Sequence, residues 1–212
     1  MTMSRKYPSH STKPASRARH AMQMGVNANE RLTSSTALVL LILLAVEGVT
    51  VLQVQTLLTL HVFVGMLLVP PVLVKLGSTL WRFAKYYGGS DDYRRKGPPP
   101  VALRVLGPFV ALLTIVLFAS GILLVLGPTS LRIQFLLLHK ASFFLWFAFM
   151  TIHVLGHFGE TMRLSTKDWT SRARQVVAGS KIRRRAMYAT LVIGLVLAFV
   201  TIPHLGSWNQ GN

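Results

Sequence analysis

The chain lacks cysteine and has very few acidic side chains. None of its 212 residues is Cys, which excludes disulfides, covalently attached c-type haem and Cys-ligated iron–sulfur or zinc sites. Any metal chemistry therefore has to use His, carboxylate, Met or Lys ligands. Lys and Arg together number 23 against 6 Asp and Glu, so the formal net charge is +17.

The chain is also poor in charge of either sign for its length. Charged residues make up 14% of it and hydrophobic residues 51%, whereas soluble domains carry about 25% charged residues. The basic residues lie between long apolar runs instead of lining one folded surface, which excludes a soluble nucleic-acid-binding protein. The sequence contains no phosphate-binding loop and no internal repeat. This composition predicts an all-α integral membrane protein.

Five apolar runs qualify as transmembrane helices, because a bilayer core takes about 20 residues per helix. They cover residues 36–52, 57–80, 105–126, 135–158 and 188–202. We expect 36–160 to form a four-helix core, 161–185 a basic loop, and 186–212 a fifth, peripheral helix with a short tail. Residues 1–35 are rich in Ser, Thr, Arg and Lys, which predicts a disordered tail.

The basic residues sort the connections into two sides. Residues 1–35, the loop before residue 105 and the loop 161–185 are basic, whereas residues 127–134 carry only Arg132. Because Lys and Arg favour the cytoplasmic side, we expect a plasma-membrane protein with the N-terminus inside and the C-terminus outside. The basic segments themselves are expected to contact lipid headgroups.

Two intramembrane histidines lie at the same predicted depth. The second and fourth helices both run inward, with His61 and His139 about seven to eight residues outside the helix midpoints. Two imidazoles that face each other in a helix bundle suit axial ligation of one haem iron. Gly65 leaves room for a porphyrin edge, and Lys140 can pair with a haem propionate or extend to the interface. The alternative is that these histidines only form hydrogen bonds between helices.

A second set of ionisable residues lies at the inner level. His153 follows His139 by fourteen residues, which places it on nearly the same helix face about 21 Å further along. Lys75 follows His61 by the same interval. His153 is therefore a candidate ligand of a second haem, with Lys75 or an external group opposite. In the alternative, Lys75 extends to the headgroups and His157 lies at the interface.

The segment from His61 to Glu160 resembles the membrane cytochrome b families of bacteria. These are the cytochrome b561-like proteins, the b-haem subunits of formate dehydrogenases and hydrogenases, and the ferric-reductase-like transmembrane domains. The motif Leu138-His139-Lys140-Ala141-Ser142-Phe143, followed by Trp146 and by His153-Val154-Leu155-Gly156-His157, carries the resemblance. It implies b haems held by histidines of a four-helix bundle. The chain departs from the pattern at Lys75, where a second histidine is expected.

Glu47 is the remaining buried charge, at the depth of His61 and His139. Gln53 and Gln134 lie at the same membrane face. A carboxyl group and amides beside an outer haem predict a quinone or proton-exchange site. The alternative is a neutral Glu47 with hydrogen bonds inside the bundle.

Taken together, the residues and the resemblance predict a b-type cytochrome with one haem b, or two, that carries electrons within or across the membrane. No soluble flavin, nicotinamide or molybdenum domain fits in 212 residues. The electron donor or acceptor is therefore expected to be another protein or the quinone pool, with this chain as one subunit of an oxidoreductase. The main alternative is a non-haem transporter or channel subunit that uses Glu47, Lys75 and the histidines as an ion or proton path.

Overall fold

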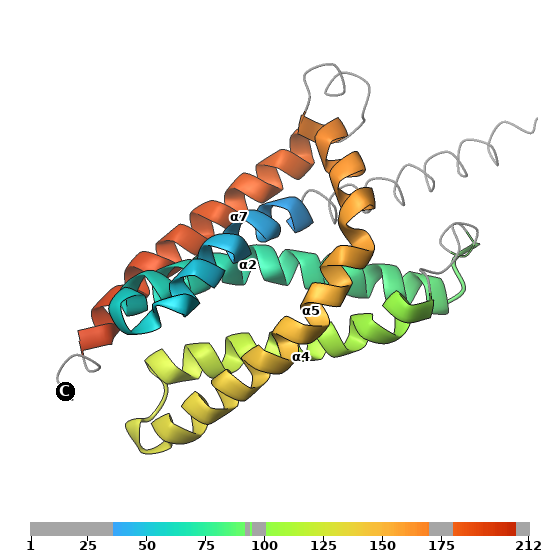
Figure 1. Ribbon diagram of the computed structural model, residues 1–212. Helices are drawn as coiled ribbons and strands as arrows, with labels where there is room; N and C mark the ends of the chain where they lie inside the picture. Colours follow the sequence, from blue (N-terminus) through green and yellow to red (C-terminus); the bar gives the residue numbers. More distant parts are fainter. Residues whose placement is uncertain (1–35, 92–93, 95–100, 170–179, 207–212) are drawn as a thin grey trace, which may run out of the picture.

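A computed structural model describes residues 36–91, 94, 101–169 and 180–206 (Figure 1). Within these ranges the chain forms helices and no strand, as the composition predicts. The predicted tail 1–35, part of the basic loop (170–179) and the last residues (207–212) lie outside the described residues.

All five predicted apolar runs are helical. The elements are the helix Thr36–Leu52, α2 (Val54–Tyr87), α4 (Val101–Leu126), η1 (Thr129–Leu131), α5 (Arg132–Trp169), α7 (Ser180–Thr201) and η2 (Ile202–Leu205). The helix α5 continues past residue 158, where its apolar run ends, because no Gly or Pro follows Gly159 before Trp169. Much of the basic loop expected at 161–185 is therefore helical.

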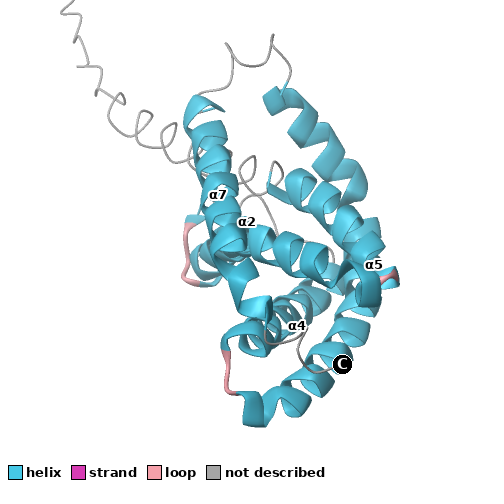
Figure 2. Ribbon diagram, turned by 90° about the vertical axis from the view of Figure 1, so that its left-hand side faces the viewer, coloured by secondary structure: helices cyan, strands magenta, loops and turns pink. Residues whose placement is uncertain are grey.

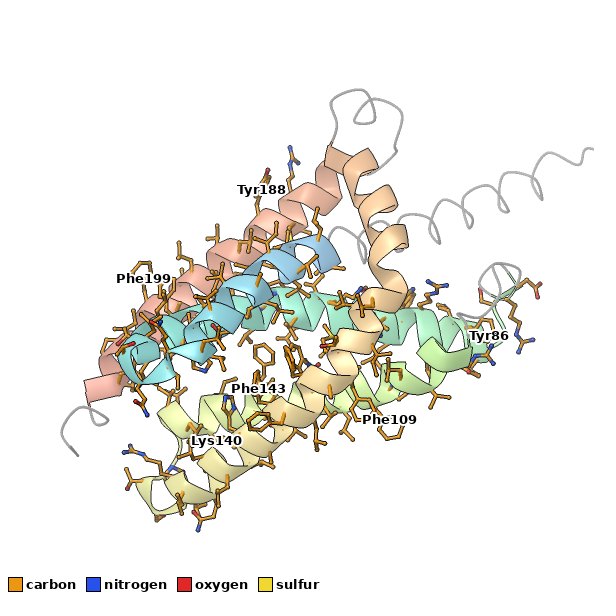
Figure 3. The ribbon with its side chains drawn as sticks, viewed as in Figure 1. Tyr86, Phe109, Lys140, Phe143, Tyr188 and Phe199 are labelled. Carbon is orange, nitrogen blue, oxygen red and sulfur yellow. The ribbon has the colours of Figure 1, made fainter. Side chains whose placement is uncertain are left out.

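Within the described part of the chain, four segments are long and apolar enough to cross a membrane. They are Val54–Tyr87, Arg104–Leu126, Thr129–Gly156 and Arg185–Leu205, and the apolar helix Thr36–Leu52 is shorter. Large apolar side chains also cover the outer faces, as Figure 3 shows for Phe109 and Phe199, whose exposed fractions are 52% and 60%. Such faces suit contact with lipid tails. The fold is therefore that of an all-α, multi-pass membrane protein.

The helices form two layers (Figures 1 and 2). The helix α7 packs along α2, and α4 packs along α5. The helix Thr36–Leu52 joins the first layer, where Leu40 forms a buried cluster with Val64, Leu68 and Val72 of α2. The two layers make few direct contacts with each other.

Candidate functional site

A cavity of about 560 Å³ lies between the two layers. Ligand-binding cavities typically have volumes of about 300–1,000 Å³ and apolar walls with a few polar groups. Here the walls are apolar side chains of the helix Thr36–Leu52, α2, α4 and α5, with Leu205 of η2 at one end. The ionisable groups in the wall are Glu47, His61, His139 and Lys140. Both histidines predicted to face each other therefore line one cavity.

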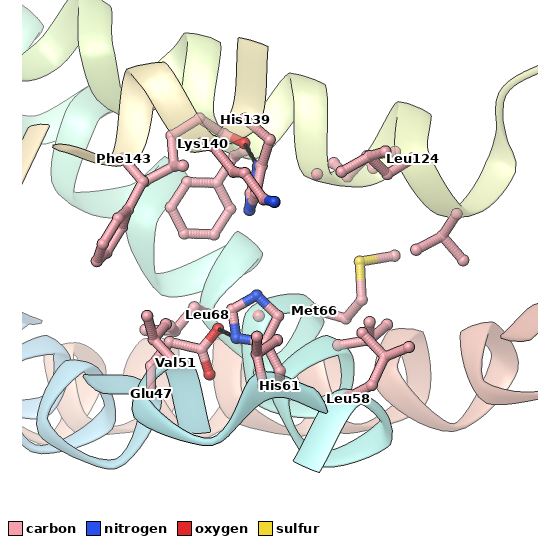
Figure 4. Close-up of a pocket in the computed structure, with 18 of the residues that line it drawn as sticks. Glu47, Val51, Leu58, His61, Met66, Leu68, Leu124, His139, Lys140 and Phe143 are labelled. Carbon is pink, nitrogen blue, oxygen red and sulfur yellow. Dashed lines mark hydrogen bonds and ion pairs between the residues drawn. The ribbon is translucent and has the colours of Figure 1, made fainter. Parts of the chain in front are cut away.

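The two histidines approach each other from opposite layers. His61 comes from α2 and His139 from α5, and the ring centroids are 6.3 Å apart with an interplanar angle of 77°. Figure 4 shows a ring nitrogen of each histidine directed toward the other ring across the cavity. The matched depths predicted from the sequence therefore agree with this juxtaposition.

The other ring nitrogen of His139 is held by α4. His139 Nδ1 lies 3.1 Å from the Leu117 carbonyl and 3.2 Å from Ser120 Oγ. The Ser120 hydroxyl itself donates to the Leu117 carbonyl at 2.9 Å. Because a carbonyl oxygen only accepts, Nδ1 is the protonated nitrogen of His139. In the neutral ring the lone pair is then on Nε2, which faces the cavity.

His61 has a different partner, which comes from the helix Thr36–Leu52. His61 Nδ1 lies 3.0 Å from Glu47 Oε1 and 3.2 Å from Thr50 Oγ1. The single Thr50 hydroxyl proton is shared between the Glu47 carbonyl at 2.7 Å and Glu47 Oε2 at 3.1 Å. An ionised Glu47 only accepts, and His61 then donates to it from Nδ1. As in His139, Nε2 of His61 is left facing the cavity.

The geometry of the pair fits axial ligation of one metal ion. Consider one nitrogen of each ring about 2 Å from a common metal ion, on opposite sides of it. With ring bonds of about 1.3 Å, the two ring centroids then lie about 6 Å apart. The observed separation is 6.3 Å. Two imidazoles are also the number of protein ligands that a haem iron takes in bis-histidine cytochromes, since the porphyrin supplies the other four nitrogens. The residues present therefore fit a b-type haem.

Small residues make room around the two rings. A Cβ atom built on Gly121 of α4 would lie 3.0 Å from Cε1 of His139, so glycine allows this ring to lie against the helix. Gly65, which the sequence predicts to leave room for a porphyrin edge, lines the cavity, and a Cβ there would lie 3.5 Å from Glu47 Oε1. Lys140 is exposed at the cavity wall, where its ammonium group can reach an anionic group on a bound ligand.

A buried hydrogen bond joins α4 and α5 beside the cavity. The Trp146 indole N–H donates to Thr114 Oγ1 at 2.9 Å, and the Thr114 hydroxyl donates to the Val110 carbonyl at 2.7 Å. Trp146 is 7% exposed and lines the cavity. Because its only polar group is satisfied, the large indole ring is fixed in the wall.

The remaining predicted site residues lie elsewhere. Lys75 and His153 are partly buried, and neither lines the cavity. Gln53 and Gln134 are exposed and also lie outside the cavity wall. For His157 only the backbone, in α5, belongs to the described part of the chain. Among the residues whose placement is described, no group of three or more His, Cys, Asp or Glu side chains could hold a metal ion.

Sequence reasoning missed most of the groups that hold the two imidazoles. It placed Glu47 near the level of His61, which Glu47 contacts, but assigned it to a site with Gln53 and Gln134, and it did not single out Ser120 or Gly121. The connectivity could have identified Ser120 and Gly121, because α4 and α5 are consecutive antiparallel helices. Residues that face each other across such a pair have numbers with a nearly constant sum. The pairs 114–146, 120–139 and 121–139 sum to nearly the same number, centred on the α4–α5 turn.

Comparison of the chain with protein-family models, with curated proteins and with solved structures finds no match.

Proposed function

We propose that this protein is a membrane b-type cytochrome in which His61 and His139 are the axial ligands of one haem b. The observation that carries the proposal is the pair of imidazoles 6.3 Å apart in an apolar cavity, each held at Nδ1 by a partner.

A bound haem would supply reversible one-electron chemistry between ferrous and ferric iron. The chain's own residues suit that task. His61 and His139 would take both axial positions, which favours electron transfer over oxygen binding. The cavity wall is mostly apolar, and Lys140 would pair with a propionate. The substrate side would be a redox partner protein or quinone, with this chain as the membrane subunit of an oxidoreductase.

The helix Thr36–Leu52 brings Glu47 to His61, so we include it among the membrane-spanning helices and propose five spans instead of four. The helix Thr36–Leu52 has 17 residues, the lower end of the length that crosses a bilayer core. It runs antiparallel to α2, because Leu40 packs near Val72 at one end while Glu47 contacts His61 at the other. We therefore propose that it crosses as the first span, with the basic N-terminus cytoplasmic and the C-terminus outside the plasma membrane.

The test is an optical spectrum of the detergent-purified protein, oxidised and dithionite-reduced, with a pyridine haemochrome assay for haem per chain. The wild-type protein should show b-type bands at about one haem per chain. His61→Ala and His139→Ala should each lose the low-spin, six-coordinate bands and weaken or abolish haem binding, because only one imidazole is left to hold the iron. His204→Ala is the matched control, since His204 is exposed in η2.

The outcomes separate the alternatives. Haem retained with unchanged bands in both ligand variants would refute the assignment. Two haems per chain, with one lost in His153→Ala, would make His153 the ligand of an inner haem as the fourteen-residue spacing predicts. A wild-type protein without a Soret band after expression with ample haem would instead favour the transport path through Glu47, Lys75 and the histidines. That path predicts a proton or ion flux sensitive to Glu47→Gln.

A further inference from the structure

The two histidines that face the cavity are held by chemically different groups. On the α5 side, His139 donates to a neutral backbone carbonyl, that of Leu117. On the α2 side, His61 lies 3.0 Å from a carboxyl oxygen of Glu47. Each imidazole therefore has a partner at Nδ1, but only one partner is a side chain that can carry charge.

Glu47 is itself held in place. The Thr50 hydroxyl lies within 3.2 Å of both Glu47 Oε2 and His61 Nδ1, and Thr50 is only 1% exposed. The side chains of His61 and Glu47 are 19% and 15% exposed. In an apolar surrounding a carboxyl group needs such partners, because an unsatisfied polar group there is costly. The three side chains thus form one connected unit across two helices.

A group that accepts from the distal nitrogen of a metal-binding histidine fixes which nitrogen is protonated and how the ring is oriented, and it raises the basicity of the other nitrogen. A carboxyl group does this more strongly than a backbone carbonyl, since hydrogen bonds to ionised acceptors are stronger. Glu47 Oε1 is at hydrogen-bonding distance for this effect on His61.

We propose that Glu47 is a positioning residue for His61, which fixes the Nδ1–H tautomer and makes this imidazole the stronger electron donor of the two. The proposal rests on the proposed function, since it assigns the haem iron as what His61 Nε2 binds. It also gives the helix Thr36–Leu52 a direct part in the site. Glu47 then acts on the haem through His61, whereas the sequence suggested a separate site with Gln53 and Gln134.

The first experiment measures haem per chain and the midpoint potential of the full-length protein in detergent. Glu47→Gln keeps an acceptor oxygen but removes the carboxylate, so haem should stay bound while the midpoint potential becomes more positive. Glu47→Ala removes the acceptor, so haem affinity should fall by about 10- to 100-fold. Asp91→Asn is the control, because Asp91 is exposed four residues beyond the end of α2. Unchanged potential and haem content in both Glu47 variants would overturn the proposal.

A second readout works without haem. In protein labelled with ¹⁵N-histidine, the His61 signals are assigned as those lost in His61→Ala. The wild type should show the Nδ1–H tautomer for His61, and Glu47→Ala should shift it towards Nε2–H. A wild type with no bound haem but this tautomer would refute the cytochrome and retain the role of Glu47. An Nε2–H tautomer in the wild type would overturn that role whatever the haem content.

Discussion

At the scale of single residues, the cavity wall contains few polar groups, and both histidines among them have hydrogen-bonding partners. His139 is held by Leu117 and Ser120, and His61 by Glu47 and Thr50. A polar side chain inside a membrane is expensive unless it is paired or functional. Here the pairing uses one nitrogen of each imidazole and leaves the other directed into the cavity, which is the arrangement of a metal ligand with its supporting partner.

Gly121 should contribute to haem binding through the histidine that it contacts. A Cβ at this position would lie 3.0 Å from Cε1 and 3.3 Å from Nδ1 of His139, which is tighter than ordinary packing. Gly121→Ala should therefore tilt the ring away from the Leu117 carbonyl and weaken haem binding by about 10-fold, the lower range for loss of a supporting contact. The measurement is haemin titration of the purified protein followed at the Soret band.

The control lies on the same helix. A Cβ at Gly107 of α4 would meet nothing within 4 Å, so Gly107→Ala should leave haemin binding unchanged. Equal affinities for the Gly121→Ala variant and the wild type would show that the position of the His139 ring does not limit binding.

At the scale of helices, the first layer depends on a close approach of α7 to α2. Pro71 has no N–H, so it cannot bond to the Leu67 carbonyl one turn earlier in α2. That carbonyl faces Gly194 of α7, where a Cβ would lie 2.5 Å from its oxygen. Neighbouring helices commonly cover backbone groups that proline leaves without a helical partner in a membrane span. Small residues at such crossings allow close packing.

Gly194→Ala should destabilise the protein even though alanine favours helices. The added methyl group would overlap the Leu67 carbonyl, which is backbone and cannot rotate away, so α7 has to shift. Overpacking of this kind costs about 1–3 kcal/mol. The measurement is thermal or SDS-induced unfolding followed by circular dichroism. Gly77→Ala, where a Cβ meets nothing within 4 Å, should leave the transition unchanged or raise it slightly. A Gly194→Ala transition equal to that of Gly77→Ala would contradict the close packing.

At the scale of the whole molecule, the sequence was a good guide to the helical elements. Apolar runs predict where the helices lie in the sequence. The charged residues that flank each run predict the level of every residue along the helix axis. That information was enough to bring His61 and His139 together. It does not fix how each helix is rotated about its axis, and this rotation decides that Glu47 contacts His61 and that Ser120 and Gly121 contact His139.

The two-layer arrangement was also beyond the sequence. The fifth helix was expected to be peripheral, but α7 packs along α2, and Leu205 beyond its end reaches the cavity wall. Lengths of apolar runs carry no information on which helix pairs with which. The close approach at Gly194 depends on a carbonyl that only the folded α2 presents, so it has no counterpart in hydropathy.

The number and direction of the spans can be tested directly, because the chain has no cysteine and every introduced thiol is the only one. Single variants at Ser11, Gln55, Ser90 and Ser130 place one thiol in each of four segments. With five spans and a cytoplasmic N-terminus, Ser11→Cys and Ser90→Cys should be shielded in intact cells or right-side-out vesicles. Gln55→Cys and Ser130→Cys should react with a membrane-impermeant maleimide. The basic flanks predict this pattern through the preference of Lys and Arg for the cytoplasm.

The pair Ser11→Cys and Gln55→Cys decides whether the helix Thr36–Leu52 crosses the membrane, since these two positions flank it. Labelling of both from the same side would mean that this 17-residue helix lies in the interface. Glu47 and His61 would then lie near the headgroups, and a haem there would be in contact with water. Labelling from opposite sides would instead place the Glu47–His61 pair inside the bilayer, at the depth of His139. The same experiment therefore tests the environment of the proposed haem as well as the topology.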